Sequence, residues 1–220
     1  MQIQHLHLYT TKLQAQHHFY QETLDLPTST LQTNTFTVTI GQSQLQFHAS
    51  NFATPYHFAI NIPANKIQEA AAWLAERVAI QPYKEQQIVN FEAWNAKAVY
   101  FYDLDYNIVE LIARKNTQPI VEQSFGVEQW LGISEIGAPT SDVEGLCAVL
   151  IEEGLSCYSG DLKNFAAIGE EEGLFIIINK DQRKWLPNED QAFASPFKIQ
   201  FEQKGTTVFG QFEAGAFTLL

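Results

Sequence analysis

The stretch ISEIGAPTSDVEGLCAVLIEEG, residues 133–154, combines a strand, a cap and a helix in one short run. Apolar residues alternate over 133–138, which predicts a strand. Ser141 and Glu144 stand at the spacing of a capping box, the sequence signature of a helix start. Apolar residues then recur with a helical period and end before Gly154, a favourable residue after a helix. They are Val143, Leu146, Cys147, Leu150 and Ile151.

The same order of signals occurs twice earlier in the chain. Residues 3–9 alternate like a strand and precede a helical pattern that starts near Leu13. Residues 57–62 alternate likewise and precede a helical pattern over 67–78. Each of the three helices is followed by β-rich sequence, which gives a repeating βαβββ unit. These β-rich stretches are 35–40 and 43–48, 98–102 and 107–112, and 165–168 and 174–179.

The repeat predicts an α+β fold in which the first two units form a pair. Residues 115–124 contain Pro119 among mixed polar residues and are typical of a linker. We therefore expect one domain at 1–114, and a second region at 125–220 that holds the third unit. A fourth unit starts at 196–201 but looks truncated, because too few residues follow for a helix and three strands.

Composition limits the classes of partner. Acidic residues number 25 and basic residues 13, so the formal net charge of -12 disfavours nucleic acids and anionic membranes. The 45% hydrophobic content is enough to fill a core. Two cysteines without a CxxC motif favour a reducing compartment. No signal peptide and no apolar stretch of membrane-spanning length is present, so we expect a cytoplasmic protein.

Several strands carry polar side chains that could meet in one site. His5 and His7 share a strand face, as do Gln46 and His48. His57 starts the strand of the second unit, and Glu110 stands in the apolar run 108–112. Burying a carboxylate without a partner costs several kcal/mol, so Glu110 requires a cation or strong hydrogen bonds.

The sequence resembles the opening of the vicinal-oxygen-chelate superfamily, which includes glyoxalase I, extradiol dioxygenases and bleomycin- and fosfomycin-resistance proteins. The resemblance lies in 5–8, Leu13 and 19–27, then in 57–60, and finally in YFYDLDYNIVEL at 100–111. It covers Met1 to about Arg114. It implies paired βαβββ modules that form a cup-shaped mixed sheet, with a third, degenerate module following.

The resemblance also implies a metal site. The family's ligand positions match His5, His57 and Glu110, with a variable fourth position at Gln46. The chain departs from the family pattern at Leu104 and Tyr106, where a Pro and a Gly are usual, and at Gln46, where Glu is usual. Tyr100 matches the tyrosine that extradiol enzymes place beside the substrate, and it is the candidate catalytic residue. His7, His48 and Trp94 are expected to line the pocket or to support the ligands.

The donor set predicts one divalent metal per chain. Two histidines and one carboxylate with open positions suit Fe(II) or Mn(II), which we favour. A site with four ligands would suit Zn(II) or Ni(II), with Gln46 as the fourth. In the third and fourth units Glu135 takes the place of His5, but Lys198 takes the place of His57. A permanent cation does not hold a metal, so no second site is expected.

Three functions remain open at this point. The first is a dioxygenase-like enzyme that chelates a small-molecule substrate through vicinal oxygens. The second is a glyoxalase-like isomerase or lyase that uses Zn(II) or Ni(II), and the third is a binding protein without turnover. The incomplete fourth unit would leave a sheet edge open, so residues 125–220 are expected to dock on the first domain or to form a homodimer, which we prefer.

Overall fold

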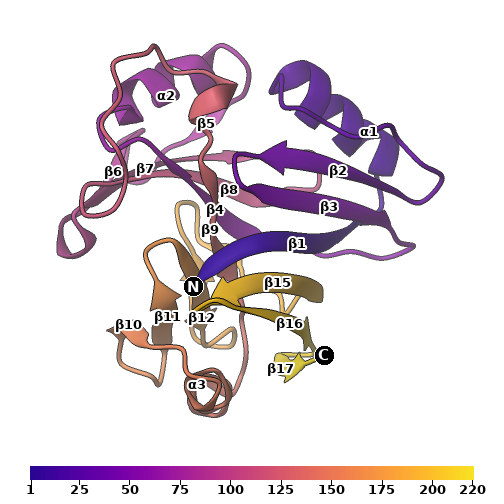
Figure 1. Cartoon of the computed structure of the whole chain (residues 1–220), viewed down its shortest axis with the longest axis vertical. Coiled ribbons are helices and arrows are strands. Elements are labelled where there is room, and N and C mark those ends of the chain that lie inside the picture. The colour runs from indigo at the N-terminus through magenta and orange to yellow at the C-terminus, as the bar shows by residue number, and fades with distance from the viewer.

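The computed structural model describes residues 1–220 and contains two large mixed sheets with three short helices (Figure 1). Unit 1 consists of β1 (Gln2–Thr10), α1 (Leu13–His18), the π-helical turn η1 (Phe19–Thr23), β2 (Thr35–Ile40) and β3 (Ser43–Ala49). Unit 2 consists of β4 (His57–Ile62), α2 (Ile67–Ala75), β5 (Ile80–Gln81), β6 (Val89–Phe91), the 3-10 turn η2 (Glu92–Trp94), β7 (Ala96–Tyr102) and β8 (Ile108–Arg114).

The second half of the chain holds units 3 and 4. After the 3-10 turn η3 (Val127–Gln129), unit 3 consists of β9 (Gly132–Gly137), α3 (Val143–Glu152), β10 (Cys157–Gly160), β11 (Phe165–Glu170) and β12 (Gly173–Ile178). A small hairpin follows, made of β13 (Lys184–Trp185) and β14 (Asp190–Gln191). Unit 4 is a three-stranded meander without a helix, made of β15 (Phe197–Gln203), β16 (Thr206–Glu213) and β17 (Ala216–Leu219).

The units pair in an order that differs from the expected one. Units 2 and 3 share a sheet of order β10-β11-β12-β9-β4-β8-β7-β5, with β6 also pairing with β7. Units 1 and 4 share a sheet of order β17-β16-β15-β1-β3-β2. The junctions β4·β9 and β1·β15 are both antiparallel. The fold is therefore α+β with paired units, but the pairs are 2 with 3 and 1 with 4.

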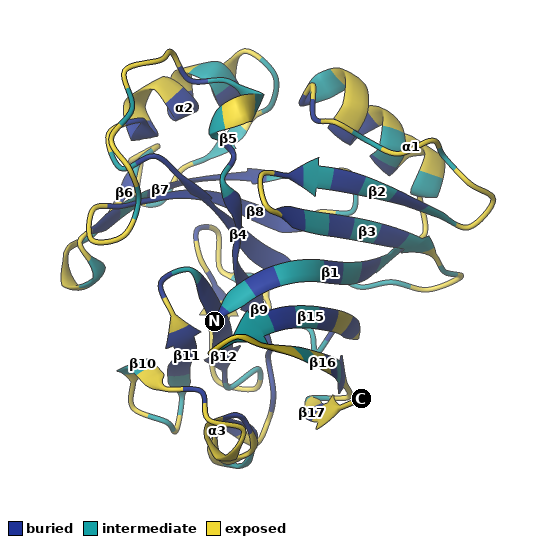
Figure 2. Ribbon diagram, in the orientation of Figure 1, coloured by how far each residue is buried: buried dark blue, intermediate teal, exposed yellow.

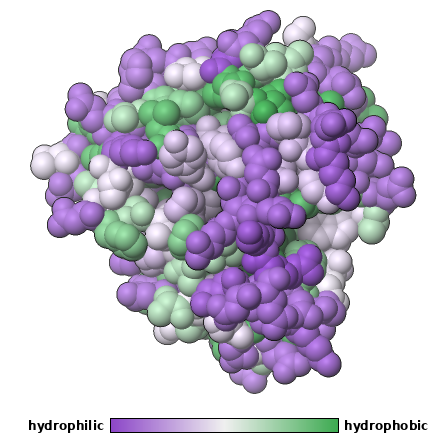
Figure 3. Space-filling view, turned by 180° about the vertical axis from the view of Figure 1, so that it is seen from behind, coloured by the Kyte–Doolittle hydropathy of each residue, from purple (hydrophilic) through white to green (hydrophobic).

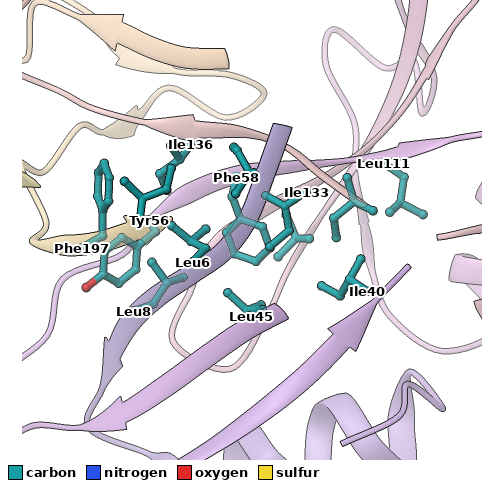
Figure 4. Packing of buried hydrophobic residues seen from close by; sticks show 14 of the residues in the cluster. Leu6, Leu8, Ile40, Leu45, Tyr56, Phe58, Leu111, Ile133, Ile136 and Phe197 are labelled. Carbon is teal, nitrogen blue, oxygen red and sulfur yellow. The ribbon is translucent and has the colours of Figure 1, made fainter. Parts of the chain in front are cut away.

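This pairing corrects the expected division at residue 114. One apolar core of 45 buried residues runs from Met1 to Phe217 and joins both sheets. Leu6 and Leu8 of β1 meet Phe58 of β4 and Ile136 of β9 in this core (Figure 4). The loop 115–124 is joined to the turn before α2, where Asn65 Nδ2 donates to the Val121 carbonyl. The chain does not divide into independent halves at this loop.

The two sheets share the core, so their other faces point away from each other. Along β1, buried residues alternate with half-buried ones, whereas every residue of β4, β8 and β9 is buried (Figure 2). Strand β4 is covered on both faces because the β13–β14 hairpin lies over its second face, where Trp185 packs 4.8 Å from the His57 ring. The open sheet edge from which a dimer was expected is occupied within the chain, because β15 pairs with β1.

The helix caps differ in detail from the predicted capping box. Asp142, and not Ser141, precedes α3, and its carboxylate accepts from the Gly145 amide at 2.9 Å. Ser141 instead donates to Asp181. The longest helix has 10 residues, and no helix has the length and apolarity needed to cross a membrane. Both cysteines are free. Seen from behind, the surface is mostly hydrophilic, with hydrophobic residues dispersed among polar ones (Figure 3).

Candidate functional site

The candidate site lies on the outer face of the sheet of units 2 and 3. Strand register aligns Tyr100 with Glu110, Glu110 with Ala59, and Ala59 with Glu135. Four neighbouring strands thus place a tyrosine and two glutamates in one row, with the small Ala59 between the carboxylates. His57 lies two residues before Ala59 and therefore on the same face. This row forms the floor of the site.

Three side chains of this face come close enough to share an ion. Ligand atoms of His57, Glu110 and Glu135 all lie within 4.8 Å of one another, and all three residues are buried. His57 Nε2 stands 3.6 Å from Glu110 Oε2. On the other side of its ring, His57 Nδ1 lies 3.3 Å from the Ile108 carbonyl. A carbonyl only accepts, so Nδ1 carries the proton and the Nε2 lone pair faces the carboxylate.

Burial sets the protonation of these groups. Desolvation lowers the pKa of His57 to about 4, so its imidazole is neutral at pH 7. Desolvation, followed by repulsion from Glu135, raises the pKa of Glu110 well above its usual value, although Arg114 and a hydrogen bond from Tyr100 oppose this. Two lone pairs thus face each other across 3.6 Å. Such a pair requires a shared proton or a cation between them.

Arg114 gives Glu135 a cationic partner. Its Nη2 donates to Glu135 Oε1, and the guanidinium is fully buried, 5.4 Å from the centre of the Trp94 ring. Its Nε and Nη1 have no hydrogen-bond partner. Desolvation raises the pKa of Glu135, and Arg114 opposes that shift. The floor therefore holds two carboxyl groups and one permanent cation.

A cavity of about 320 Å³ opens above this floor. Its walls are mostly apolar and aromatic, and Arg183 and Lys184 are exposed at its rim. The wall residues include Phe91, Trp94, Phe165, Ile176, Ile178 and Trp185. The β13–β14 hairpin is held over the cavity by Asn188, whose amide donates to the Tyr102 hydroxyl at 3.0 Å and to Gln81 at 2.9 Å. A small cavity with few polar groups suits a flat apolar ligand.

The donor set fits a divalent metal. Mn(II) and Fe(II) accept mixed imidazole and carboxylate ligands, and here one imidazole and two carboxylates converge. The His57 tautomer is the one that leaves Nε2 free to coordinate, with Nδ1 held by a backbone carbonyl. Arg114 contacts only Oε1 of Glu135, so the second carboxylate oxygen is left for an ion. The residues that converge are therefore His57, Glu110 and Glu135, a group that could hold a metal, in place of the expected His5/His57/Glu110 set.

The structure separates the predicted ligands into two groups. His57, Glu110, Tyr100 and Trp94 lie at the cavity. His5 and Gln46, with His7 and His48, lie on the outer face of the other sheet, because β1 pairs with β15 and β3 instead of β4. His5 therefore does not approach His57 and Glu110.

The predicted site lacked Glu135 and Trp185, which line the cavity, and Arg114, which pairs with Glu135. Glu135 stands in the apolar run of β9 just as Glu110 stands in β8, so the cost of burying a carboxylate was a usable signal for both. Arg114 had no such signal, because it was taken as the last residue of the domain 1–114, next to the linker. Trp185 belongs to a hairpin of two-residue strands, too short for periodicity to reveal.

Comparison with known proteins gives a likeness in structure only. No family model matches the sequence, and no curated protein does. Among solved structures, the chain is similar to a lactoylglutathione lyase from Agrobacterium tumefaciens, with 16% identity and a TM-score of 0.42 over 50% of this chain and 90% of that one. It is similar to a glyoxalase/bleomycin resistance protein/dioxygenase from Alicyclobacillus acidocaldarius, with 18% identity and a TM-score of 0.43 over 51% and 91%.

A third similar structure is the fosfomycin resistance protein FosX from Mesorhizobium loti, with 15% identity and a TM-score of 0.38 over 52% of this chain and 92% of that one. The likeness concerns the fold and covers about half of this chain in each case. It does not assign an activity.

Proposed function

We propose that this protein is a metal-dependent enzyme that binds one Mn(II) or Fe(II) ion at His57, Glu110 and Glu135 and acts on a small aromatic compound. The proposal rests on one observation above all: three buried ligand-type side chains converge within 4.8 Å at the floor of an apolar cavity. A bound ion would polarise substrate oxygens as a Lewis acid. A dioxygenase-like reaction on vicinal oxygens is the activity we favour.

The chain's own side chains would orient the substrate. Aromatic walls such as Trp94 and Phe165 fit a flat ring. Burial raises the pKa of Tyr100 well above 10, so its hydroxyl stays protonated, and its one proton can go either to Glu110, as in the structure, or to a substrate oxygen. At the rim, Arg183 and Lys184 suit a substrate that carries an anionic group.

Calorimetric titration of metal-free protein with Mn(II) tests the proposed metal site. We expect one ion per chain and a loss of about a hundredfold or more in affinity for His57→Ala and for Glu110→Gln, because each removes a ligand. His5→Ala is the matched control, since it removes a histidine from the other sheet and should leave Mn(II) affinity unchanged. Full affinity in either cavity variant would remove the metal from the proposal.

Oxygen uptake tests the reaction once the metal is established. With Fe(II)-loaded protein and catechol-type compounds, we expect oxygen consumption that Tyr100→Phe reduces without loss of metal. Metal binding without any oxygen uptake would instead favour an isomerase or lyase. For an isomerase or lyase, the sequence analysis expected Zn(II) or Ni(II) with Gln46 as the fourth ligand. Gln46 lies in the other sheet and is not near His57 and Glu110.

A second candidate function is a binding protein that needs no metal. The ion pair of Arg114 with Glu135 favours it, because a protonated Glu110 would then leave the floor neutral without any added ion. Quenching of tryptophan fluorescence by aromatic acids, measured on metal-free protein, distinguishes the two functions. Tight binding that is unchanged by Glu110→Gln and by added Mn(II) would support the binding protein over the enzyme.

A further inference from the structure

The outer face of the sheet of units 1 and 4 carries a second group of donor atoms, far from any carboxylate of the cavity floor. Strands β1 and β3 are parallel neighbours, with His7 beside Gln46 and Tyr9 beside His48 in register. On the opposite face of the same strands, Leu6, Leu8 and Leu45 fill the core (Figure 4). His7, Gln46 and His48 therefore share the outer face, where each is half-buried.

The amide of Gln46 lies between β2 and His48, with its nitrogen toward β2. Its Nε2 donates to Thr35 Oγ1 at 3.3 Å and to Thr37 Oγ1 at 3.4 Å, both on β2. Its carbonyl oxygen Oε1 must then point the other way, and it lies 3.0 Å from His48 Nε2. The same His48 nitrogen lies 3.3 Å from His7 Nδ1.

In this orientation of the Gln46 amide, at most one proton is available for the two contacts of His48 Nε2. If His48 Nε2 carries a proton, that single proton serves both Gln46 Oε1 and His7 Nδ1. If His7 Nδ1 carries the proton, then the His48 lone pair faces the Gln46 carbonyl, and two acceptors meet at 3.0 Å. A cation in place of the proton would accept a lone pair from all three atoms at once.

The distances fit coordination of one ion. Two nitrogens bound to the same Zn(II) at about 2.1 Å lie about 3.0–3.4 Å apart for near-tetrahedral or square geometry, and the two imidazole nitrogens are 3.3 Å apart. We propose that His7, His48 and Gln46 form a binding site for a divalent cation of the Zn(II), Ni(II) or Cu(II) class. The site is separate from the one in the cavity and has the nitrogen-rich donors that these metals prefer.

Both imidazoles are available as neutral ligands. Desolvation is the main cause that lowers the pKa of His7 and of His48, so both are uncharged at pH 7. The charged group facing them is Lys198, directly opposite His7 on β15, and His5 lies on the same strand with its ring 6.3 Å from that of His7. Lys198 is exposed and forms no ion pair, so its side chain can move away, although its charge weakens cation binding.

Electron paramagnetic resonance of full-length protein with one equivalent of Cu(II) is the first test, because it needs no substitution. The proposed site supplies two imidazole nitrogens, whereas the cavity supplies one, from His57. We expect nitrogen hyperfine splitting from two imidazoles. A single-nitrogen spectrum that stays unchanged when a second equivalent of Cu(II) is added, or the spectrum of free Cu(II), would overturn the proposal.

Zinc calorimetry on the variant His57→Ala/Glu110→Gln isolates the site, since the cavity ligands are removed. We expect one Zn(II) per chain with a dissociation constant tighter than about 100 μM, and about tenfold or greater loss on adding His7→Ala or His48→Ala. His18→Ala, an exposed histidine of α1, is the matched control and should change nothing. Weaker binding in the parent variant, or an equal loss for His18→Ala, would overturn the proposal.

The substitution Lys198→Gln should strengthen Zn(II) binding, whereas the histidine substitutions should weaken it. It removes no ligand. Removal of a neighbouring cation should tighten Zn(II) binding roughly two- to fivefold. If the face instead bound anions, the same substitution would weaken phosphate binding and leave Zn(II) affinity unchanged or lower, which would contradict the proposal. Because none of the three tests measures Mn(II) binding or turnover, their failure leaves the cavity proposal untouched.

Discussion

The two sheets share one construction and present opposite chemistry. In each, two units meet at an antiparallel junction of their first strands, β4 with β9 in one sheet and β1 with β15 in the other. The face of the first sheet holds two carboxyl groups and an arginine beneath a hairpin. The corresponding face of the second holds histidines, glutamines and threonines and has no covering hairpin.

Burial explains much of this difference. Under the β13–β14 hairpin, Glu110 and Glu135 are each only 3% exposed, so every charge requires a partner within the cavity. On the uncovered face, water can solvate Lys198 and the half-buried histidines, and no permanent charge has to be paired. An oxygen-rich donor set therefore suits Mn(II) or Fe(II) in the cavity, and a nitrogen-rich set suits Zn(II) or Cu(II) outside.

Removal of the second half of the chain should have the largest effect, because it disrupts both sheets. A fragment that ends at Arg114 loses β9 and β15, the partners of β4 and β1, together with core residues such as Ile136 and Phe197. We expect the fragment to lose cooperative thermal unfolding and to aggregate, because two long sheet edges and apolar surface are exposed. Calorimetry and light scattering measure this.

A soluble fragment would have a specific meaning. If residues 1–114 stayed folded, β1 and β4 would have paired with each other, and His5 would then lie beside His57. Mn(II) binding by that fragment, lost on His5→Ala, would show that the second half of the chain directs the pairing and is not needed for folding. This outcome would contradict our expectation.

The substitution Glu135→Gln tests how strongly the covered sheet depends on a single charge. The substitution leaves the Arg114 guanidinium buried without an anionic partner, so we expect unfolding free energy to fall by about 3–5 kcal/mol. Lys198→Gln is the matched change on the other sheet, where an exposed unpaired charge is removed, and it should alter stability by less than about 0.5 kcal/mol. Urea denaturation of both variants compares them. Equal effects would mean that the cavity floor is not desolvated.

Much of the secondary structure could be predicted from the sequence. The strands predicted at 35–40 and 57–62 coincide with β2 and β4, and the absence of a helix in unit 4 agrees with the predicted truncation. Period-two alternation fixes such strands locally because one face of each must be buried. The short strands β5, β6, β13 and β14 were missed, since two or three residues carry no period.

The pairing of the units could not be predicted from these patterns. The first strands of all four units are apolar and can form an antiparallel junction, so sequence alone allows β4 to pair with β1 or with β9. The choice depends on the fit of the whole core, for example Phe197 and Phe201 of β15 against the same core as Leu6. His57 and Glu110 were found because they belong to one unit. The third member, Glu135, depended on the choice of partner.

The dependence of metal binding on pH is the smallest effect that we predict, and it bears on the covered sheet alone. Burial raises the pKa of Glu110, so in metal-free protein this carboxyl holds its proton to a higher pH than an ordinary glutamate does. A metal binds only the carboxylate, so binding must release that proton. Below the raised pKa of Glu110, Mn(II) affinity should fall about tenfold for each pH unit, because one proton competes with one ion.

Two measurements follow from this proton. Calorimetry of Mn(II) binding in buffers of different ionisation enthalpy should give about one proton released per ion at pH values below the raised pKa of Glu110, a count that Glu110→Gln removes together with high affinity. Zn(II) binding to the outer face should release almost none at the same pH, because burial lowers the pKa of His7 and His48 and leaves both neutral. Equal proton release at the two sites would mean that the hairpin does not control the protonation of Glu110. The covered and uncovered sheets would then differ only in the types of residue that they carry.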